Sequence, residues 1–369
     1  MGASKLNYVD FLRGIAILGV FWLHFTGDSR AMAWLPDVLK TLVQQGGKGV
    51  ELFFVVSAFT LFRSYHHRGQ HEPNPVRNFF TRRFFRIAPM YYLAILYYLW
   101  QNGTGGQQFL GATVYNTWDN ILANFFFLQE LNPHYMWLVP GSWSVTTEMF
   151  FYLFVPLLVR WIPNLAMALR FFFLATIMRF GVVYGIKLLH LFPQTSIWEG
   201  YLYFFLPNQL LVFAAGIVLY HLLSTENWPK IPSWMLLSLA VMIVLDFSTG
   251  GLRIFPLHFW FALAFVMLAV ACSRFSFEHM VGRVVRHIGK VSFSLYLTHW
   301  AVMHGLSEAG LLKVHLFEGW GMAVLDYTWR FALALGIAVG ISTLTYRFIE
   351  MPMVDFANRW IEKSKPKAT

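Results

Sequence analysis

The first apolar segment of the chain carries two ionisable side chains in a pattern that suits acid–base chemistry. Arg13 and His24 fall on one face of the helix that this segment predicts, roughly 16 Å apart along its axis at about 1.5 Å per residue. Ionisable groups inside a membrane are costly, and they usually face a protein interior or a water-filled cavity. We therefore expect a guanidinium near the inner end and a titratable imidazole near the outer end of one functional face. The alternatives are that Arg13 extends to the lipid headgroups with Asp10 as its partner, and that His24 is a hydrogen-bonded core residue.

Two carboxylates are expected at a depth similar to that of the histidine. Glu148 lies about two turns into a later predicted helix that starts with Trp143 and Ser144. A carboxylate at that depth can orient and charge an imidazole, as a general base requires. The alternative is a capping role, although Glu148 lies a turn too deep for a capping box. Glu51 enters at a similar depth and either joins the same site or only pairs with Lys48.

Three arginines stand in the expected loop between the second and third apolar segments. Arg82, Arg83 and Arg86 place up to two guanidinium groups on one helical face. Because a guanidinium forms a planar fork that matches phosphate oxygens, these residues suit the binding of a phosphorylated cofactor. The alternative is that they only anchor the chain at the inner membrane surface.

A further polar group lies near the carboxyl end of the chain. Ser294, Tyr296 and His299 fall within about two turns of a predicted helix, where they form either a site or a polar contact between helices. No metal site is predicted, because the 13 histidines are scattered and no cysteine or carboxylate cage accompanies His66 and His67.

The elements that must position these residues are membrane helices. With 57% hydrophobic, 19% aromatic and only 12% charged residues, the 369-residue chain does not have the composition of a water-facing surface. A spanning helix needs about 20 mostly apolar residues. We predict an all-α integral membrane protein with about ten transmembrane helices. Their expected positions are residues 8–26, 48–65, 84–101, 143–160, 165–183, 201–221, 233–247, 254–272, 291–308 and 324–346.

The distribution of basic residues predicts the orientation of these helices. Lys and Arg are about threefold more numerous in the segments that lie inside when the amino terminus is cytoplasmic, which is the bias of the positive-inside rule. An even number of spans then puts both termini in the cytoplasm. The same topology accounts for the net charge of +10 without a nucleic-acid partner. No removable signal peptide is expected, because Asp10 and Arg13 interrupt the first apolar run.

Two other features carry weaker predictions. The expected outside segment 101–142 lacks Lys and Arg and is rich in aromatic and amide side chains. It suits either a folded cap that stacks on sugar rings or an aromatic belt at the membrane interface. The single cysteine, Cys272, lies in an apolar run, so it cannot form an intramolecular disulfide and is read as a small buried hydrophobe.

Taken together, these segments resemble the acyltransferase-3 family of membrane acyltransferases, which includes many bacterial O-acetylases of surface polysaccharides. The resemblance covers nearly the whole chain, and no single motif is specific, but six occur in family order. They are Arg13 with His24 (Arg-x10-His), Gly49 to Ser57, Arg82-Arg83-Phe-Phe-Arg86, Trp143 to Glu148, Ser294 to His299, and Tyr346 to Pro352. Two positions depart from the family pattern: Glu51 replaces the usual Asp, which keeps the charge, and Ala58 replaces a Gly, which affects close helix packing.

The resemblance implies a donor, an acceptor and residue roles. Acetyl-coenzyme A would be the cytoplasmic co-substrate, held by Arg82, Arg83 and Arg86, and a hydroxyl of an envelope polysaccharide or glycolipid would be the acceptor. The catalytic residues would be His24, Glu148 and Arg13. The supporting residues would be Asp10, Glu51, Trp143, Ser144, Tyr296 and His299.

The resemblance also implies a place in the cell. The protein would cross the bacterial cytoplasmic (inner) membrane several times, with residues 1–350 as the membrane acyltransferase domain and 351–369 as a cytoplasmic basic tail. A proton-coupled secondary transporter or a flippase of an envelope precursor is the alternative, since intramembrane Arg, His and Glu also line proton pathways, but no internal repeat supports it. The acceptor, the acyl chain, the choice between direct transfer and an acyl-enzyme, and the oligomeric state stay open.

Overall fold

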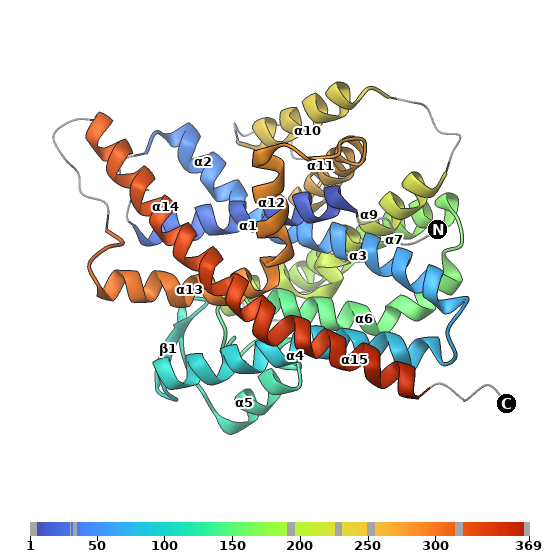
Figure 1. The fold of residues 1–369 in the computed structure, drawn as a ribbon, viewed down its shortest axis with the longest axis horizontal. Coiled ribbons are helices and arrows are strands. Elements are labelled where there is room, and N and C mark those ends of the chain that lie inside the picture. Colours follow the sequence, from blue (N-terminus) through green and yellow to red (C-terminus); the bar gives the residue numbers. More distant parts are fainter. Residues whose placement is uncertain are drawn as a thin grey trace. The chain divides into compact units, whose positions relative to one another are not determined.

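Helices form most of the protein, in two compact units. The computed structural model describes residues 6–29, 31, 35–189, 196–225, 231–248, 255–313 and 320–364. Unit 1 comprises Met1–Val56 and Pro229–Tyr346, and unit 2 comprises Ser57–Trp228 and Arg347–Thr369. Figure 1 shows the elements of both units.

Unit 1 is built on the first helix of the chain. Its elements are α1 (Asn7–Asp28), α2 (Asp37–Gln45), a short 3₁₀ turn (Gly46–Lys48), the first residues of α3 (Gly49–Gly69), α10 (Ser233–Ser248), α11 (Leu257–Cys272), α12 (Met280–Lys290), α13 (Ser292–Glu308) and α14 (Trp320–Thr345). Helix α1 packs against α12, α13, α11 and the turn that precedes α3. Unit 1 therefore surrounds the helix that carries Arg13 and His24.

Glycines set the closest of these helix contacts. A Cβ atom at Gly289 of α12 would overlap the carbonyl oxygen of Asp10 on α1, and one at Gly46 would overlap the carbonyl oxygen of Gly19. Because glycine lacks that atom, α12 and the turn before α3 approach the backbone of α1 directly. These contacts fix the position of α1 in unit 1.

Unit 2 combines long helices with a small folded segment. Its elements are the remainder of α3, α4 (Pro75–Asn102), β1 (Gly106–Phe109), β2 (Ala112–Tyr115), α5 (Trp118–Phe125), a 3₁₀ turn (Gln129–Leu131), α6 (Trp143–Trp161), α7 (Leu165–Leu188), α8 (Ser196–Phe204), α9 (Leu206–Ser224) and α15 (Met351–Lys363). A π-helical turn at Tyr346–Glu350 leads from α14 into α15.

The segment between α4 and α6 is folded. Strands β1 and β2 pair antiparallel, with Gly106 opposite Tyr115 and Phe109 opposite Ala112. Leu110 and Gly111 link them with positive φ angles of 48° and 84°, the conformation that tight two-residue hairpins favour. Helix α5 and the 3₁₀ turn follow, so segment 101–142 is folded, and the choice between a cap and an interfacial aromatic belt stays a prediction.

The predicted spans are helical, with two differences. Segment 201–221 is not one helix, because α8 ends at Phe204 and Pro207 stands in the first turn of α9, where it lacks an N–H to donate. The placement of Arg82 and Arg83 in a loop was wrong: α4 begins at Pro75, a favoured first helical residue, and includes them together with Arg86, which the predicted span 84–101 already contained.

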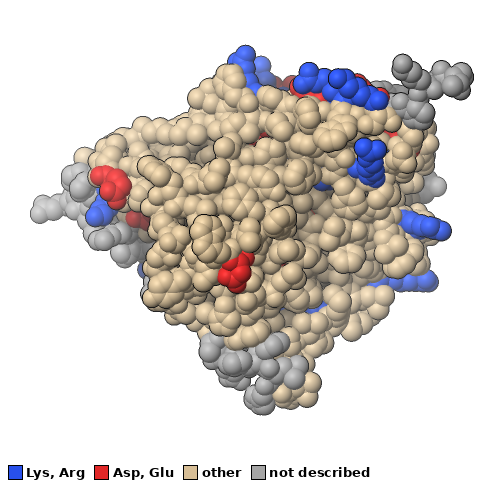
Figure 2. Space-filling model, turned by 90° about the horizontal axis from the view of Figure 1, so that it is seen from below, with Lys and Arg blue, Asp and Glu red and all other residues tan. Residues whose placement is uncertain are grey.

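The protein has the helices of an all-α membrane protein. Among the described residues, four helical stretches are long and apolar enough to cross a bilayer: Asn7–Asp28, Leu165–Ile186, Ser196–Ser224 and Gly321–Lys363. The surface seen in Figure 2 is formed mostly by residues other than Lys, Arg, Asp and Glu. Large apolar side chains such as Leu96, Phe173 and Leu174 are exposed, as lipid-facing residues are. The number of spans and the side of each terminus stay predictions.

Candidate active site

Two histidines predicted separately lie together in unit 1. Helix α1 is uninterrupted, so Arg13 and His24 share it as expected. The ring centroid of His24 is 5.4 Å from that of His299 and 4.4 Å from that of Trp300, both on α13. The fold therefore places the imidazole of α1 against the polar group of α13.

The hydrogen bonds of His299 define which of its ring nitrogens is basic. Its Nδ1 is 2.8 Å from the carbonyl oxygen of Tyr296 and 3.2 Å from that of Leu295. Since a carbonyl oxygen only accepts, Nδ1 carries the proton and Nε2 presents a lone pair. His299 is 1% exposed, and its Nε2 has no hydrogen-bond partner among the described residues. A buried lone pair of this kind can accept a proton or a hydroxyl hydrogen bond from a substrate.

Contacts with α14 orient the carboxyl end of α1. The indole N–H of Trp22 donates to the hydroxyl of Tyr327 at 2.9 Å, and Thr26 shares a hydrogen bond with the same hydroxyl at 2.8 Å. Phe25 packs edge-on against the Tyr327 ring, with centroids 5.5 Å apart. These contacts restrict rotation of α1 about its axis, which keeps His24 facing α13.

Glu51 forms a buried ion cluster in unit 1. Its Oε1 lies 2.7 Å from Lys48 Nζ and 2.8 Å from Nδ1 of His258, and all three residues are buried. The pairing with Lys48 was one of the two readings of the sequence, and His258 is a partner that the sequence did not suggest. Because opposite charges compensate each other there, Glu51 holds α3 and α11 together at this point.

In unit 2, Glu148 is paired by hydroxyl groups. The hydroxyl of Ser57 donates to its Oε1, and that of Tyr152 donates to the same atom at 2.7 Å. The guanidinium of Arg83 lies over the rings of Tyr152 and Phe79, 5.8 Å and 5.7 Å from their centroids. Glu148 and the predicted cofactor-binding Arg83 are thus part of one cluster. The predicted pairing of Glu148 with the histidine of α1 joins residues of different units and stays a prediction.

The arginine run lines a small pocket of unit 2. Arg82 binds Glu72 through two hydrogen bonds, of 2.9 Å and 2.6 Å. Burial opposes ionisation of Glu72, but the hydrogen bonds and charge of Arg82 outweigh it and hold the pKa of this carboxyl below its usual value. Arg68 and Arg83 line the same pocket, whereas Arg86 is not among its lining residues. Three guanidinium groups around one carboxylate form a site where an anion can replace that carboxylate.

Trp143 lines a different, aromatic pocket of unit 2, whereas Ser144, the next residue of α6, is not among its lining residues. The Trp143 ring lies 4.4 Å from that of Phe204, and the Ser144 hydroxyl donates to the Gly141 carbonyl at 3.1 Å. The pocket is lined by aromatic residues and by one buried carboxyl, Glu130.

Glu130 is the acidic group of this aromatic pocket. Thr147 donates a hydrogen bond to its Oε1, and its Oε2 has no partner among the described residues. Burial raises the pKa of Glu130 to about 8, and the hydrogen bond from Thr147 only partly opposes that rise. The sequence analysis did not single out this residue, because nothing in segment 101–142 distinguishes a buried acid from an exposed one.

Other partners missed in the sequence differ in how visible they were. Tyr152 stands four residues after Glu148, so a helical reading could have paired them. His258 is 207 residues from Glu51, and only the tertiary fold brings them together. Within the described residues, no group of three or more His, Cys, Asp or Glu side chains could hold a metal ion.

Comparison with known proteins assigns the chain to a family. A family model described as an acyltransferase domain matches residues 6–347. "Putative O-acetyltransferase" of Staphylococcus aureus (strain COL) is 23% identical over 398 residues, covering 95% of this chain, and the chain spans 58% of that relative's length. "Acyltransferase MdmB" of Streptomyces mycarofaciens is 25% identical over 398 residues, covering 99% of this chain and 95% of the relative. No solved structure matches the chain significantly.

The matched region contains all the site residues of unit 1. It also contains nearly all of unit 2. Since the match extends over most of the chain, the assignment does not depend on one segment. The chain belongs to the acyltransferase-3 family.

Proposed function

We propose that this protein is a membrane-embedded O-acyltransferase that moves an acyl group, acetyl in the first instance, from acyl-coenzyme A to a hydroxyl of a cell-envelope glycan or glycolipid. Family membership supports acyl transfer, and the names of two relatives include O-acetyltransferase and acyltransferase. The observation that carries the proposal is the pair formed by His24 and His299, in which a buried ring nitrogen is free to accept a proton.

The chemistry assigned to this pair is general-base catalysis. His24 removes the proton of the acceptor hydroxyl as its oxygen attacks the thioester carbonyl, a contribution of about 10²–10⁴ in rate. The new ester C–O bond forms, the C–S bond breaks, and the departing coenzyme A thiolate takes the proton. The Nε2 lone pair of His299, on α13, accepts a hydrogen bond from a hydroxyl group of the substrate and so holds it beside His24. Arg13 is proposed to balance the charge of the donor or of the developing oxyanion.

The donor is proposed to bind through the arginines of unit 2. Arg82 and Arg83 line a pocket with Arg68, and phosphate oxygens can take the place of the Glu72 carboxylate there. Arg86 lies farther along the same helix and is retained as a candidate contact. No metal is proposed.

The proposed setting is the bacterial cytoplasmic membrane. The chain would cross it about ten times with both termini inside. The donor would come from the cytoplasm, and the acceptor would be reached from the outer side.

The test is loss of product in a variant that still reaches the membrane. We expect H24A to abolish O-acetyl groups on the envelope glycans, measured by mass spectrometry at matched membrane expression. H304Q is the control, since His304 is an exposed histidine on the same helix as His299. Undiminished acetylation in H24A would remove His24 from the mechanism. Accumulation of an envelope precursor in proteoliposomes without acetyl-coenzyme A turnover would instead favour a transporter.

A further inference from the structure

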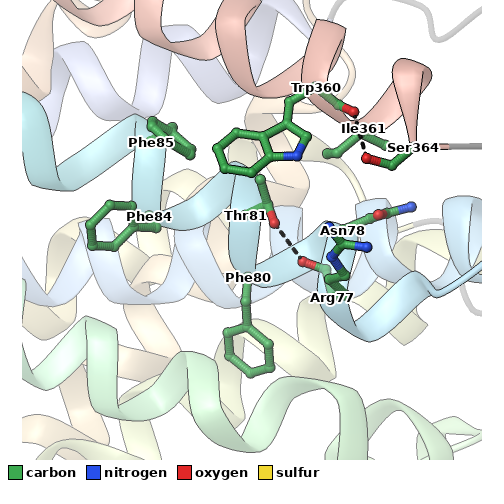
Figure 3. A pocket seen from close by; sticks show the side chains of 9 residues that line it. All are labelled: Arg77, Asn78, Phe80, Thr81, Phe84, Phe85, Trp360, Ile361 and Ser364. Carbon is green, nitrogen blue, oxygen red and sulfur yellow. Dashed lines mark hydrogen bonds between the residues drawn. The ribbon is translucent and has the colours of Figure 1, made fainter.

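A second pocket of unit 2 lies between α4 and α15. It has a volume of about 300 Å³, and Figure 3 shows its lining side chains. Helices α4 and α15 pack side by side, so the two sequence segments that make up unit 2 meet at this pocket. The pocket is distinct from the arginine pocket that contains Glu72, although both share the first turns of α4.

Aromatic rings form one wall of the α4–α15 pocket. Trp360 of α15 is 46% exposed, and its ring centroid lies 5.9 Å from that of Phe85 on α4, with the planes tilted by 52°. Phe356 packs against both rings, with centroids 5.7 Å and 5.2 Å away. The neighbouring rings hold the indole in place, so its exposed part can stack on a planar ring without a large loss of side-chain entropy.

Two hydroxyl groups in the pocket present acceptors. The hydroxyl of Thr81 donates to the Arg77 carbonyl at 2.9 Å, and that of Ser364 donates to the Trp360 carbonyl at 2.9 Å. Both are drawn as dashed lines in Figure 3. Because each proton is used within its own helix, the oxygen lone pairs remain to accept from a ligand N–H. The pocket thus combines a stacking surface with acceptors.

The rim of the pocket carries a guanidinium that is available to an anion. Arg77 is exposed and forms no ion pair with a described residue. Asn78 lines the same pocket and donates to Glu72 at 3.2 Å, the carboxylate that also binds Arg82. Arg82 in turn donates to Asn358 of α15 at 3.4 Å. The arginine pocket is therefore linked to the α4–α15 pocket through Asn78, and to helix α15 through Asn358.

We propose that the α4–α15 pocket binds the purine base of an adenine nucleotide, which is the nucleotide end of the coenzyme A donor. The base stacks on Trp360, and its exocyclic amine donates to the hydroxyl oxygens. Its phosphates meet Arg77 and the neighbouring Arg82. This inference rests on the proposed function, because it assigns a binding site to the donor of that reaction.

The experiment measures binding of adenosine 3′,5′-bisphosphate to the full-length protein in lipid nanodiscs. We expect W360A and R77Q each to weaken binding by about tenfold, as loss of one base stack or one charged contact does. W360F should retain most of the affinity, which separates loss of stacking from misfolding. W100A is the control, because Trp100 is an exposed tryptophan at the other end of α4. Unchanged binding in W360A and R77Q would overturn the inference.

A second measurement separates the inference from the proposed function. We expect W360A to raise the KM for acetyl-coenzyme A while turnover of acetyl-pantetheine, which has no nucleotide, stays as in the wild type. An equal loss with both donors would overturn the base-binding role. If neither donor is turned over by any variant or by the wild type, the proposed function is wrong. The nucleotide-binding result would then stand on its own. If R77Q and W360A lose affinity for anionic-lipid vesicles and keep that for the nucleotide, the pocket is a lipid site and the inference is wrong.

Discussion

The imidazole rings of His24 and His299 lie 5.4 Å apart, although 275 positions of the chain separate the two residues. Each stands on a different helix of unit 1, and the Nε2 of His299 faces no hydrogen-bond partner among the described residues. The two rings are therefore candidates for one proton-transfer site. Removal of either ring should then lower the acyl-transfer activity.

Replacing His299 should separate its structural from its chemical role. H299N keeps an amide N–H that can donate to the Tyr296 carbonyl and loses the Nε2 lone pair, so we expect near-normal thermal stability and about 10²-fold lower transfer activity. H299A should also lose stability, because the carbonyl is left without its donor. The measurements are the melting temperature in detergent and acetyl-coenzyme A turnover. Full activity of H299N would confine His299 to helix packing.

The buried cluster around Glu51 should be a large contributor to stability. E51Q removes the carboxylate charge that pairs with Lys48 and His258, and breaking one partner of a buried pair costs about 3–5 kcal/mol. We expect a large fall in melting temperature, partly recovered in the double variant E51Q/K48M. The control is D37N, because Asp37 pairs with Lys40 at an exposed position where such pairs contribute about 0–1 kcal/mol. Equal effects of E51Q and D37N would contradict the prediction.

The ion pair of Glu72 with Arg82 should affect both acid stability and donor binding. Because the pKa of Glu72 is lowered in the folded protein, the pair stabilises the fold above the ordinary carboxyl pKa and is lost as the pH falls through the lowered value. The stability of the E72Q variant should therefore fall less than that of the wild type as the pH is lowered. It should also tighten binding of coenzyme A several-fold, since Arg82 no longer has a resident carboxylate. Weaker binding by E72Q would show that Glu72 positions Arg82 for the donor.

Glu130 should give the opposite dependence on pH. Its raised pKa of about 8 means that its contribution is fully present below the ordinary carboxyl pKa and is lost as the pH rises through 8. Between the ordinary carboxyl pKa and pH 8, the free energy of unfolding falls by at most about 1.4 kcal/mol per pH unit. E130Q stays neutral, so its melting temperature should change less between pH 6 and pH 9 than that of the wild type. E199Q, at an exposed glutamate of α8, serves as the reference variant. Parallel curves for wild type and E130Q would rule the effect out.

Residues close in sequence were predictable, and those joined by the tertiary fold were not. The run around Arg13 predicted α1 within two residues at each end, because a mostly apolar stretch of this length has few alternatives in a membrane. The three-residue spacing of Lys48 and Glu51 suggested their pair. No such spacing points to His258, because it lies 207 residues after Glu51, on another helix.

Two helices show the same distinction at the level of elements. Helix α12 was not predicted, because its eleven residues include Arg283, Arg286 and Lys290 and so fall short of any spanning criterion. It is amphipathic, and its role as a neighbour of α1 depends on Gly289, which only the packed structure reveals. The break before α9 could have been read from Pro207, since proline stops a helix that comes from its amino-terminal side.

Cys272 has a practical consequence. It is the single thiol in the sequence, and it is buried at the end of α11, with only 4% of its surface exposed. Maleimide reagents therefore meet almost no background reaction on the folded protein. A cysteine introduced one at a time into each inter-helix loop would be labelled selectively from one side of an intact spheroplast. A series of such variants would map the orientation of every span in the native sequence, with no need for a thiol-free parent.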